Sequence, residues 1–289
     1  MPNSNRSENF LPIMHNWENY FSHPDEGLGT TYERFILHTL FALIEENFKI
    51  KSVIEAPIFG MTGISGINSI WWAKRGKKVY ICDDNFNRLR LIKKIWTDLN
   101  CPVSTILNRT ETLNLRSNSV DLIWNFAASW FIPDLTDFAI RAKRTARKLI
   151  FICVPNNRGI GYLLRKKMVG VPPGLNLNHL DPREIKNAFS GDGWSLWREG
   201  LFDIPPWPDI PMKKEDLLKK IGLGFCLKIV SKKSNPDQTS TQPTIVDYYS
   251  NKNPELEQQV MRYSFLENSP HLFKLLWGHH RYFIFQKDG

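Results

Sequence analysis

The sequence is poor in cysteine and has no long hydrophobic run. It contains 4 cysteines in 289 residues, and no two of them form a Cys-x-x-Cys pair, so a disulfide scaffold is excluded. The longest apolar run covers only residues 149–155, whereas a membrane-spanning helix needs roughly 20 residues. The polar N-terminal residues also lack the apolar segment of a secretory signal peptide. These absences predict a cytoplasmic protein with reduced cysteines and no transmembrane segment.

Internal repeats and clusters of metal ligands are absent from the sequence as well. Apolar residues make up 42% of the chain and charged residues 23%, which is ordinary globular composition and excludes a fibrous or disordered protein. The net charge is +9. A basic surface favours anionic partners, although solvated helix faces explain such residues more simply. The basic residues are clustered as Arg141, Lys143, Arg144, Arg147 and Lys148, then 165–167, then Lys213 and Lys214, then Lys219 and Lys220.

Apolar strand patterns alternate with amphipathic helical patterns along most of the chain. This alternation predicts an α/β fold, with a mostly parallel Rossmann-like sheet and helices on both faces. The predicted strands are 52–56, 78–82, 103–107, 120–126, 149–154, 195–204 and 281–286.

Capping signals place the starts of three predicted helices. Thr30 and Glu33 have the spacing of a capping box. Pro133 opens another helix, and Asp181 caps a third helix that begins at Pro182.

The turn after the first predicted strand is rich in glycine. Gly60, Gly63 and Gly66 lie there, and Asp83 follows Gly63 by twenty positions, at the end of the second strand. In open α/β sheets, ligands bind at the carboxyl ends of the strands. Glycines allow a close approach of the backbone, and an acid after the second strand can bind the hydroxyls of an adenosine ribose. This combination predicts a nucleoside-type cofactor site, for NAD or for S-adenosylmethionine.

The segments SVIEAPIFGMTG, VYICDD, NRTETLNLRSNSVDLIWNFA and LIFICVPN resemble, in this order, the motifs of class I S-adenosylmethionine-dependent methyltransferases. The resemblance covers about residues 52–207, and the end HHRYFIFQKDG is similar to the antiparallel last strand of that family. It implies S-adenosylmethionine as the cofactor and methyl transfer as the activity. It also implies a cofactor site made of Glu55 (amino end), Gly60 and Gly63 (methionyl part), Asp83 or Asp84 (ribose), and Asn125 and Phe126 (methyl group and substrate).

Two positions depart from the family pattern. Pro57 stands where the family has a glycine, and Arg109 stands where an acid often contacts the adenine amine. Because arginine cannot accept a hydrogen bond, Thr110 or a backbone group is the expected adenine contact. A catalytically silent protein that kept the fold is therefore one alternative.

The sequence offers no obvious covalent catalyst. A sulfonium methyl group is already electrophilic, so the protein mainly has to align a nucleophile and exclude water. A general base would help an oxygen nucleophile. His38, His179, His279 and His280 are candidates by residue type, and His179 stands out because it follows strand five in a loop rich in Pro and Asn. His179 and Asn125 are the weak candidates for a catalytic role.

An NAD(P)-dependent oxidoreductase competes with methyl transfer, and a second motif bears on the acceptor. Tyr162 and Lys166 have the Tyr-x-x-x-Lys spacing of short-chain NAD(P)-dependent oxidoreductases, but an antiparallel last strand would exclude that family. Pro205, Pro206 and Trp207 follow the wrong strand for adenine-amine methylation. The 10 tryptophans fall mostly in core-like elements, which disfavours nucleic acid as a partner.

The predicted organisation has three parts. Residues 1–49 form an N-terminal helical lid, residues 50–210 form the cofactor-binding core, and residues 211–289 form a helical elaboration plus the final strand. The acceptor is expected to be a small molecule or a lipid. As a secondary hypothesis, the basic clusters indicate an anionic acceptor or one presented at a membrane surface.

Overall fold

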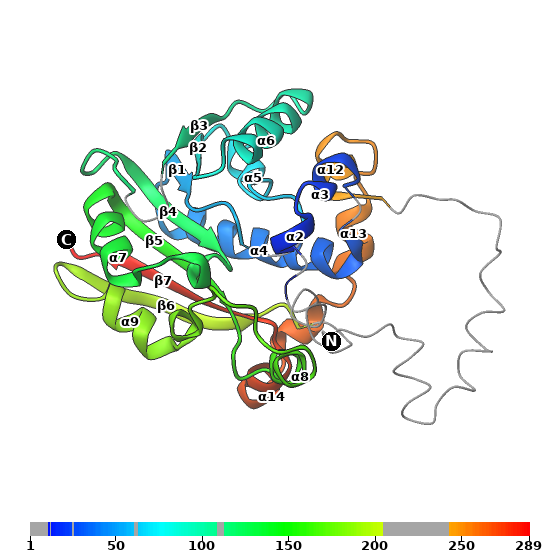
Figure 1. The fold of residues 1–289 in the computed structure, drawn as a ribbon. Coiled ribbons are helices and arrows are strands. Elements are labelled where there is room, and N and C mark those ends of the chain that lie inside the picture. The colour runs from blue at the N-terminus through cyan, green and yellow to red at the C-terminus, as the bar shows by residue number, and fades with distance from the viewer. Residues whose placement is uncertain (1–10, 12, 25, 61–62, 109–112, 205–242) are drawn as a thin grey trace, which may run out of the picture.

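The computed structural model describes residues 11, 13–24, 26–60, 63–108, 113–204 and 243–289. Seven strands form one sheet in the order β3-β2-β1-β4-β5-β7-β6 (Figure 1). Strand β7 is antiparallel to both of its neighbours, whereas the remaining pairs are parallel. This confirms the predicted sheet and its antiparallel last strand, and it argues against an oxidoreductase. The strands are β1 (Ser52–Glu55), β2 (Lys78–Asp83), β3 (Ser104–Leu107), β4 (Val120–Phe126), β5 (Ala146–Pro155), β6 (Trp194–Phe202) and β7 (His280–Lys287).

Helices cover both faces of the sheet, and each face has its own hydrophobic core. One face carries α4 (Gly27–Asn47), α5 (Ile70–Ala73), α6 (Phe86–Asp98), α12 (Ile245–Tyr249) and α13 (Leu256–Met261). The other carries α2 (Ile13–Asn16), α7 (Leu135–Thr145) and α9 (Pro182–Phe189). The remaining helices are α3 (Asn19–Ser22), α8 (Ile160–Val169) and α14 (His271–Trp277), with 3₁₀ turns η1 (Ser129–Phe131), η2 (Leu177–Leu180) and η4 (Ser264–Asn268). Helices α8 and α14 lie side by side (Figure 1).

Aromatic side chains fill the core beneath α4. Trp72 and Trp124 are fully buried, and the Phe41 ring lies 5.2 Å and 4.9 Å from their rings. These tryptophans pack in the core, as predicted, and do not form a surface for stacking bases. Cys82, Cys101 and Cys153 are buried free thiols.

The predicted start of the first long helix is wrong. Helix α4 begins at Gly27 instead of following Thr30, and no side chain caps it. Glu33 does not complete a capping box, because its carboxylate lies 3.6 Å from Nε2 of His280. Tertiary contacts therefore overrode a local signal.

The other two predicted helix starts agree better with the structure. Helix α7 begins at Leu135 and is capped by Asp134, directly after Pro133. Asp181 caps α9 and accepts a hydrogen bond from the Arg183 N–H at 2.8 Å, as predicted.

Residues 205–242, which include the Pro-Pro-Trp segment, Cys226 and the last two basic clusters, lie outside the described residues. Helices α12, α13 and α14 agree with the predicted helical character of the C-terminal part. The division into lid, core and elaboration remains a prediction. Among the described residues, no helix combines the length and the apolar character that crossing a membrane requires.

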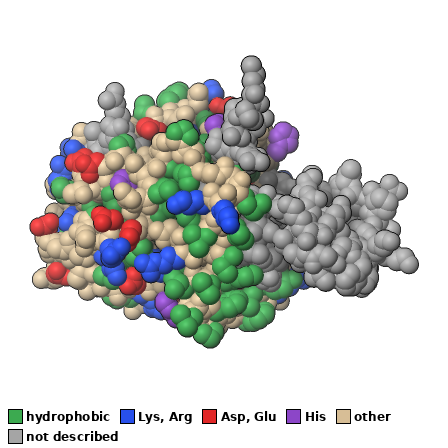
Figure 2. All heavy atoms as spheres, turned by 60° about the horizontal axis from the view of Figure 1, so that its bottom comes forward, with side chains coloured by type: hydrophobic (Ala, Val, Ile, Leu, Met, Phe, Trp, Pro, Cys, Tyr) green, Lys and Arg blue, Asp and Glu red, His purple; other side chains and the backbone are tan. Residues whose placement is uncertain are grey.

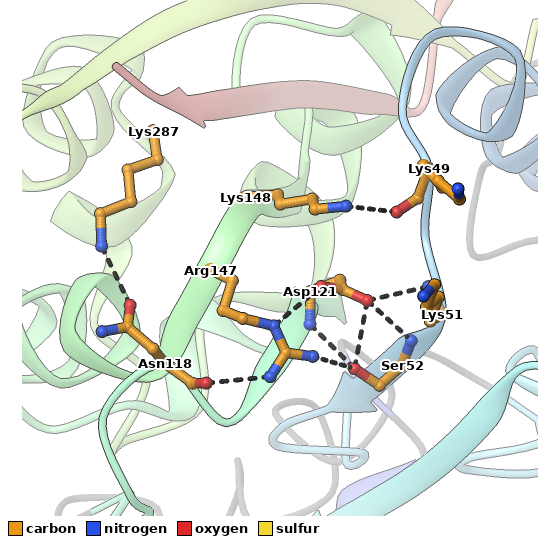
Figure 3. Close-up of polar contacts among 8 residues, drawn as sticks. All are labelled: Lys49, Lys51, Ser52, Asn118, Asp121, Arg147, Lys148 and Lys287. Atoms are coloured by element: carbon orange, nitrogen blue, oxygen red, sulfur yellow. Dashed lines mark hydrogen bonds and ion pairs between the residues drawn. The ribbon is translucent and has the colours of Figure 1, made fainter. Parts of the chain in front are cut away.

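A polar network ties the strands together at the edge of the sheet where β1, β4 and β5 begin (Figure 3). Asp121 accepts hydrogen bonds from the N–H groups of Lys51 and Ser52 at 2.8 and 3.1 Å, and from Arg147 Nε at 2.9 Å. Arg147 also donates to the Ser52 hydroxyl and to the Asn118 carbonyl. One arginine thus joins three strand starts, and part of the basic excess is structural.

Burial acts to raise the pKa of Asp121, but the hydrogen bonds from Arg147 and from the Lys51 N–H outweigh it, so the pKa is lowered. A carboxyl group with a lowered folded-state pKa stabilises the fold above its unfolded pKa. That stability is lost as the pH falls through the folded-state value.

We expect Arg147→Met to lower the free energy of unfolding at pH 7 by about 1–3 kcal/mol, because it leaves the buried Asp121 carboxylate without its charged partner. The difference from the wild type should shrink as the pH falls below about 4, where Asp121 is protonated. Urea denaturation at pH 7 and at a pH below about 4 measures the free energy of unfolding of both proteins. Arg144→Met is the matched control, because the side chain of Arg144 donates a single, exposed hydrogen bond among the described residues, to the Leu115 carbonyl. An equal loss in both variants would contradict the prediction.

Candidate functional site

The predicted site residues lie at the carboxyl ends of adjacent parallel strands. Glu55 ends β1, Asp83 ends β2, and Asn125 and Phe126 end β4. Because the three strands are parallel neighbours, these ends share one edge of the sheet, where α/β folds bind ligands. Thr110, the predicted adenine contact, lies outside the described residues.

The glycine turn packs closely against the rest of the protein. A Cβ atom at Gly60 would lie 1.9 Å from the Phe126 carbonyl oxygen, so glycine allows the turn to rest on the end of β4. Gly63 has a φ of +103°, and a Cβ there would lie 2.5 Å from Oε1 of Glu26 and 2.6 Å from Nη2 of Arg34. In this structure both glycines serve contacts within the protein, and their place beside a methionyl group remains a prediction.

A buried ion pair between Glu26 and Arg34 lies on this turn. Arg34 Nε donates to Glu26 Oε2 at 2.6 Å, and Oε1 accepts from Arg34 Nη2 and from the Ile64 N–H. The two side chains are only 1% and 4% exposed. Arg34 also donates to the Asn68 side chain at 2.7 Å. The Arg34 guanidinium and the Ile64 N–H therefore form a cradle for a carboxylate, and Glu26 fills it. Neither Glu26 nor Arg34 was predicted as a site residue.

Glu55 is buried beside this cradle. Its Oε2 accepts a hydrogen bond from the Ser69 hydroxyl at 2.6 Å, and that hydroxyl accepts one from Trp124 Nε1. Burial raises the pKa of Glu55 to about 7, against the opposing effects of Ser69 and the Arg34 charge. A cation bound next to Glu55 would favour its charged form. This agrees with the predicted role toward the amino end of a cofactor, which remains a prediction.

Asp83 is held by Arg88 through only one of its two oxygens. Arg88 Nε and Nη2 donate to Oδ1 at 3.0 and 2.7 Å, and the guanidinium lies over the rings of Phe59 and Trp17, at 4.1 and 5.0 Å. Oδ2 is buried and has no hydrogen-bond partner among the described residues. Burial raises the pKa of Asp83, although Arg88 opposes the shift.

Further buried oxygens without a partner lie at the same edge. They are Ser65 Oγ in the glycine turn, Asn125 Oδ1 at the end of β4, and Ser129 Oγ just after it, none of which has a partner among the described residues. An unsatisfied buried polar group costs about 1–3 kcal/mol, and folded proteins satisfy nearly all such groups. Together with Asp83 Oδ2, these atoms are what a polar ligand at this edge would satisfy.

Asp84 is the weaker of the two predicted ribose ligands. Its side chain is 54% exposed and lies 3.6 Å from Arg88 Nη2. Asp83, in contrast, lines a small cavity together with Pro57 and Asn108. Pro57, the departure from the family pattern, is thus a wall of the cavity that Asp83 faces.

A second polar cluster lies at the same edge, beyond β4. His280 begins β7 and is 1% exposed, with its ring centroid 4.9 Å from that of Phe126. Its Nε2 lies 3.6 Å from Glu33 Oε2, and its Nδ1 lies 3.9 Å from Asp203 Oδ2. The same Asp203 oxygen is 3.0 Å from His279 Nδ1. Glu33 and Asp203 were not predicted as site residues.

Glu33, Asp203 and His280 are ligand types for a metal, and their nearest ligand atoms lie within 4.8 Å of one another. However, each nitrogen of His280 faces a different carboxylate. A metal ion binds only one nitrogen of an imidazole ring. The arrangement is therefore an imidazole that lies between two carboxylates, at 3.6 and 3.9 Å from them, and it suits proton transfer better than metal binding.

This cluster borders a pocket between β5, α8 and the start of β7. The pocket is lined by His279 and His280, by Asn156 at the end of β5, and by Tyr162 and Arg165 of α8. Of the two residues with the Tyr-x-x-x-Lys spacing, Tyr162 therefore lines this pocket, whereas Lys166 does not. One of its lining residues, His280, packs against Phe126, the residue predicted to face the methyl group, and this pocket is therefore the candidate acceptor site.

The other histidine candidates lie in different surroundings. His38 is buried next to the Tyr249 hydroxyl at 2.8 Å, and burial lowers its pKa to about 3, so it is a neutral packing residue. His179 lies 3.2 Å from the Ser129 carbonyl and lines a different hollow, between α7 and α9. Asn125 donates to the Ala56 carbonyl at 3.3 Å.

Part of the chain is similar to a known protein family. Residues 61–151 match the family model of a methyltransferase domain. No curated protein matches the sequence.

Solved structures, one of them of a methyltransferase, share the fold. The plantazolicin methyltransferase BamL, in complex with a triazolic desmethylPZN analog and SAH, has a TM-score of 0.55 at 12% identity, over 99% of this chain and 96% of that chain. A structure from work on the conversion of a disulfide bond into a thioacetal group in echinomycin biosynthesis has a TM-score of 0.50 at 12% identity, over 86% and 81% of the two chains. At this identity the likeness concerns the fold alone.

The domain match indicates S-adenosylmethionine as the cofactor. The residues of the edge fit such a group. Asp83 Oδ2 is a buried acceptor without a partner among the described residues, and Arg34 with the Ile64 N–H already binds a carboxylate, the group at the methionyl end of the cofactor.

We expect Glu26→Gln to raise the affinity for S-adenosylhomocysteine by roughly tenfold, because the neutral amide competes less well for Arg34 than a carboxylate does. Calorimetric titration measures this affinity. As a matched ligand, 5′-methylthioadenosine lacks the amino acid part, so its affinity should stay within about twofold. Weaker binding of S-adenosylhomocysteine to the variant would instead make Glu26 a direct ligand of the cofactor.

Proposed function

We propose that this chain, a member of the class I Rossmann-like methyltransferase superfamily, transfers the methyl group of S-adenosylmethionine to a small-molecule or lipid-like acceptor. The observation that carries the proposal is the Asp83 carboxylate. It is buried at the end of β2, and its Oδ2 lacks a hydrogen-bond partner among the described residues. An acid at this point of the fold can bind the ribose hydroxyls of an adenosine cofactor.

Three groups along the edge would hold the cofactor. Asp83 would accept hydrogen bonds from the ribose, Glu55 would favour the cationic amino group, and Arg34 with the Ile64 N–H would bind the carboxylate. The bound cofactor supplies an electrophilic methyl group on its sulfonium. The protein's contribution is then to hold the acceptor in line with that group and to exclude water.

We propose that His280, which packs against Phe126, accepts the proton that the acceptor loses. An acceptor hydroxyl or amine loses a proton when it is methylated, and His280 lines the candidate acceptor pocket. Glu33 and Asp203, at 3.6 and 3.9 Å from its two nitrogens, would stabilise the imidazolium that forms. Catalytic hydrogen bonds are often longer in the absence of substrate. His279, which contacts Asp203 and is partly exposed, would give the proton a route to solvent.

A catalytically silent binding protein is the second candidate. The observation behind it is that side chains of the protein already engage the two groups assigned to the cofactor. Glu26 fills the carboxylate cradle, and Arg88 holds Oδ1 of Asp83. Titration of the wild type with S-adenosylhomocysteine separates the two functions, because a protein that has lost the cofactor would not bind it.

We expect Asp83→Asn to weaken S-adenosylhomocysteine binding by at least about tenfold, because the amide no longer presents a charged acceptor to the ribose hydroxyls. Asp84→Asn is the matched control and should change the affinity by less than about twofold, since the Asp84 side chain is 54% exposed. Calorimetric titration measures both, and thermal melting checks that each variant is folded. A larger loss in Asp84→Asn would transfer the ribose contact to that residue.

We expect His280→Gln to lower kcat by about 10²–10⁴-fold, the usual effect of a general base, with S-adenosylhomocysteine affinity unchanged. The assay is the formation of S-adenosylhomocysteine with panels of amines, alcohols, carboxylic acids and phospholipid vesicles as acceptors. His179→Gln changes the same residue type in the other hollow and should leave kcat within about twofold. The reverse order of effects would assign the role to His179, and inhibition by EDTA would assign the cluster to a metal ion.

A further inference from the structure

Helices α8 and α14 together expose an apolar surface. We define the α8–α14 surface by the exposed apolar side chains of the two helices and by Lys166 and Lys167. Figure 2 shows hydrophobic side chains gathered on this face, with basic side chains among them. The apolar members are Leu163 (51% exposed), Leu164 (38%), Met168 (43%), Leu272 (73%), Phe273 (42%) and Leu276 (50%). Contiguous exposed apolar patches mark interaction sites for proteins or membranes.

The charge of this surface has one sign. Helices α8 and α14 contain no Asp or Glu, whereas they carry Arg165, Lys166, Lys167 and Lys274. Lys166 and Lys167 are exposed, and neither forms an ion pair with a described residue. The basic side chains elsewhere at the sheet are used differently, since Arg147 and Lys148 bind groups of the protein itself.

The candidate acceptor pocket lies at the border of this surface. Gly161, Tyr162 and Arg165 of α8 and Gly278, just after α14, line the pocket together with His280. Asn156, also in the lining, donates hydrogen bonds to the carbonyls of Leu275 and Gly278, both at 2.8 Å. The end of α14 is thus attached to the pocket wall, and a molecule seated on the surface would lie beside the pocket.

We propose that the α8–α14 surface binds the protein to anionic phospholipid membranes. Exposed apolar side chains with lysines between them match a bilayer interface, where apolar groups enter the acyl region and lysines meet anionic headgroups. A second copy of the chain is a poorer partner, because a symmetric contact would bring the lysines of both copies together. Membrane binding itself does not depend on methyl transfer. If the protein is bound to a membrane, a lipid-like acceptor can enter the pocket from that membrane. This second step rests on the proposed function.

The test is co-sedimentation of the full-length protein with vesicles. Vesicles of phosphatidylcholine alone are compared with vesicles of phosphatidylcholine and phosphatidylglycerol at a molar ratio of about 3:1, which supply a negative surface potential. We expect the wild type to bind only the anionic vesicles strongly, and to dissociate as the salt concentration rises. A wild type that stays in the supernatant with anionic vesicles at low salt would overturn the proposal.

Two variants separate the apolar from the charged contribution. Leu164→Asp combined with Leu272→Asp places one acid on each helix, and Lys166→Glu combined with Lys167→Glu reverses the charge. Each double variant should reduce vesicle binding at least about tenfold. Phe86→Asp is the matched control, because Phe86 is 65% exposed on α6, outside this surface. Its binding should equal that of the wild type, and an equal loss in this control would overturn the assignment to α8 and α14.

Two further measurements on the same proteins separate a failure of membrane binding from a failure of the proposed function and from dimer formation. S-adenosylhomocysteine titration should give the same affinity for every variant, so that a failure of cofactor binding counts against the proposed function alone. Analytical ultracentrifugation reports the oligomeric state. A wild-type dimer that Leu164→Asp with Leu272→Asp converts to a monomer, with vesicle binding unaffected, would show that a second copy covers this surface and would overturn the proposal.

Discussion

The buried guanidinium of Arg34, paired here with Glu26, positions the whole candidate site. Removing two charges from water is costly, and the cost is offset only by close, multiple hydrogen bonds. Here the pair is bidentate, and the Ile64 N–H and the Asn68 side chain complete it. Arg34 also donates hydrogen bonds to the Asn68 side chain and to the Ile64 carbonyl, and it thereby attaches α4 to the glycine turn in one register. The preceding residue of the same helix, Glu33, lies 3.6 Å from His280, so that one helix supports the proposed cofactor end and the proposed acceptor end of the edge. A change in the position of α4 would disturb both ends together.

The local signals in the sequence predicted the sheet well. Strand β4 has the predicted bounds, and the antiparallel β7 differs from its predicted bounds by one residue at each end. Asp83 was found because its spacing from Gly63 follows from the geometry of a strand-turn-helix unit. The capping box at Thr30 failed because the Glu33 carboxylate faces His280 across the fold. Glu26, Arg34 and Asp203 gave no signal for a related reason. From sequence alone, a charged residue is expected to be exposed to solvent, because its buried partner is known only once the fold is known.

The basic excess of the chain has at least two different uses, which composition could not separate. Arg147 and Lys148 bind oxygens of neighbouring strand starts, at the edge opposite the candidate site. They serve to keep the sheet together, and an anionic partner is not needed to explain them. Lys166 and Lys167 stand among exposed leucines on a helix without acids, so their positive charge faces solvent. The hypothesis of an anionic or membrane-presented acceptor therefore depends on these residues, and the net charge of +9 adds little to it.

The antiparallel direction of β7 is what brings a titratable side chain to the acceptor side of the edge. In a parallel strand, the residue at this edge would be the last of the strand and would lead away into a loop. Because β7 runs the other way, its first residue, His280, lies at the edge, paired with Pro155 of β5 and Phe202 of β6. The chain arrives there directly from α14 through Gly278 and His279, so the exposed α14, the pocket wall and His280, our proposed proton acceptor, are consecutive in sequence. A partner bound to α14 would therefore act on the residues next to His280, and this links the surface to the chemistry of the pocket through a few residues of backbone.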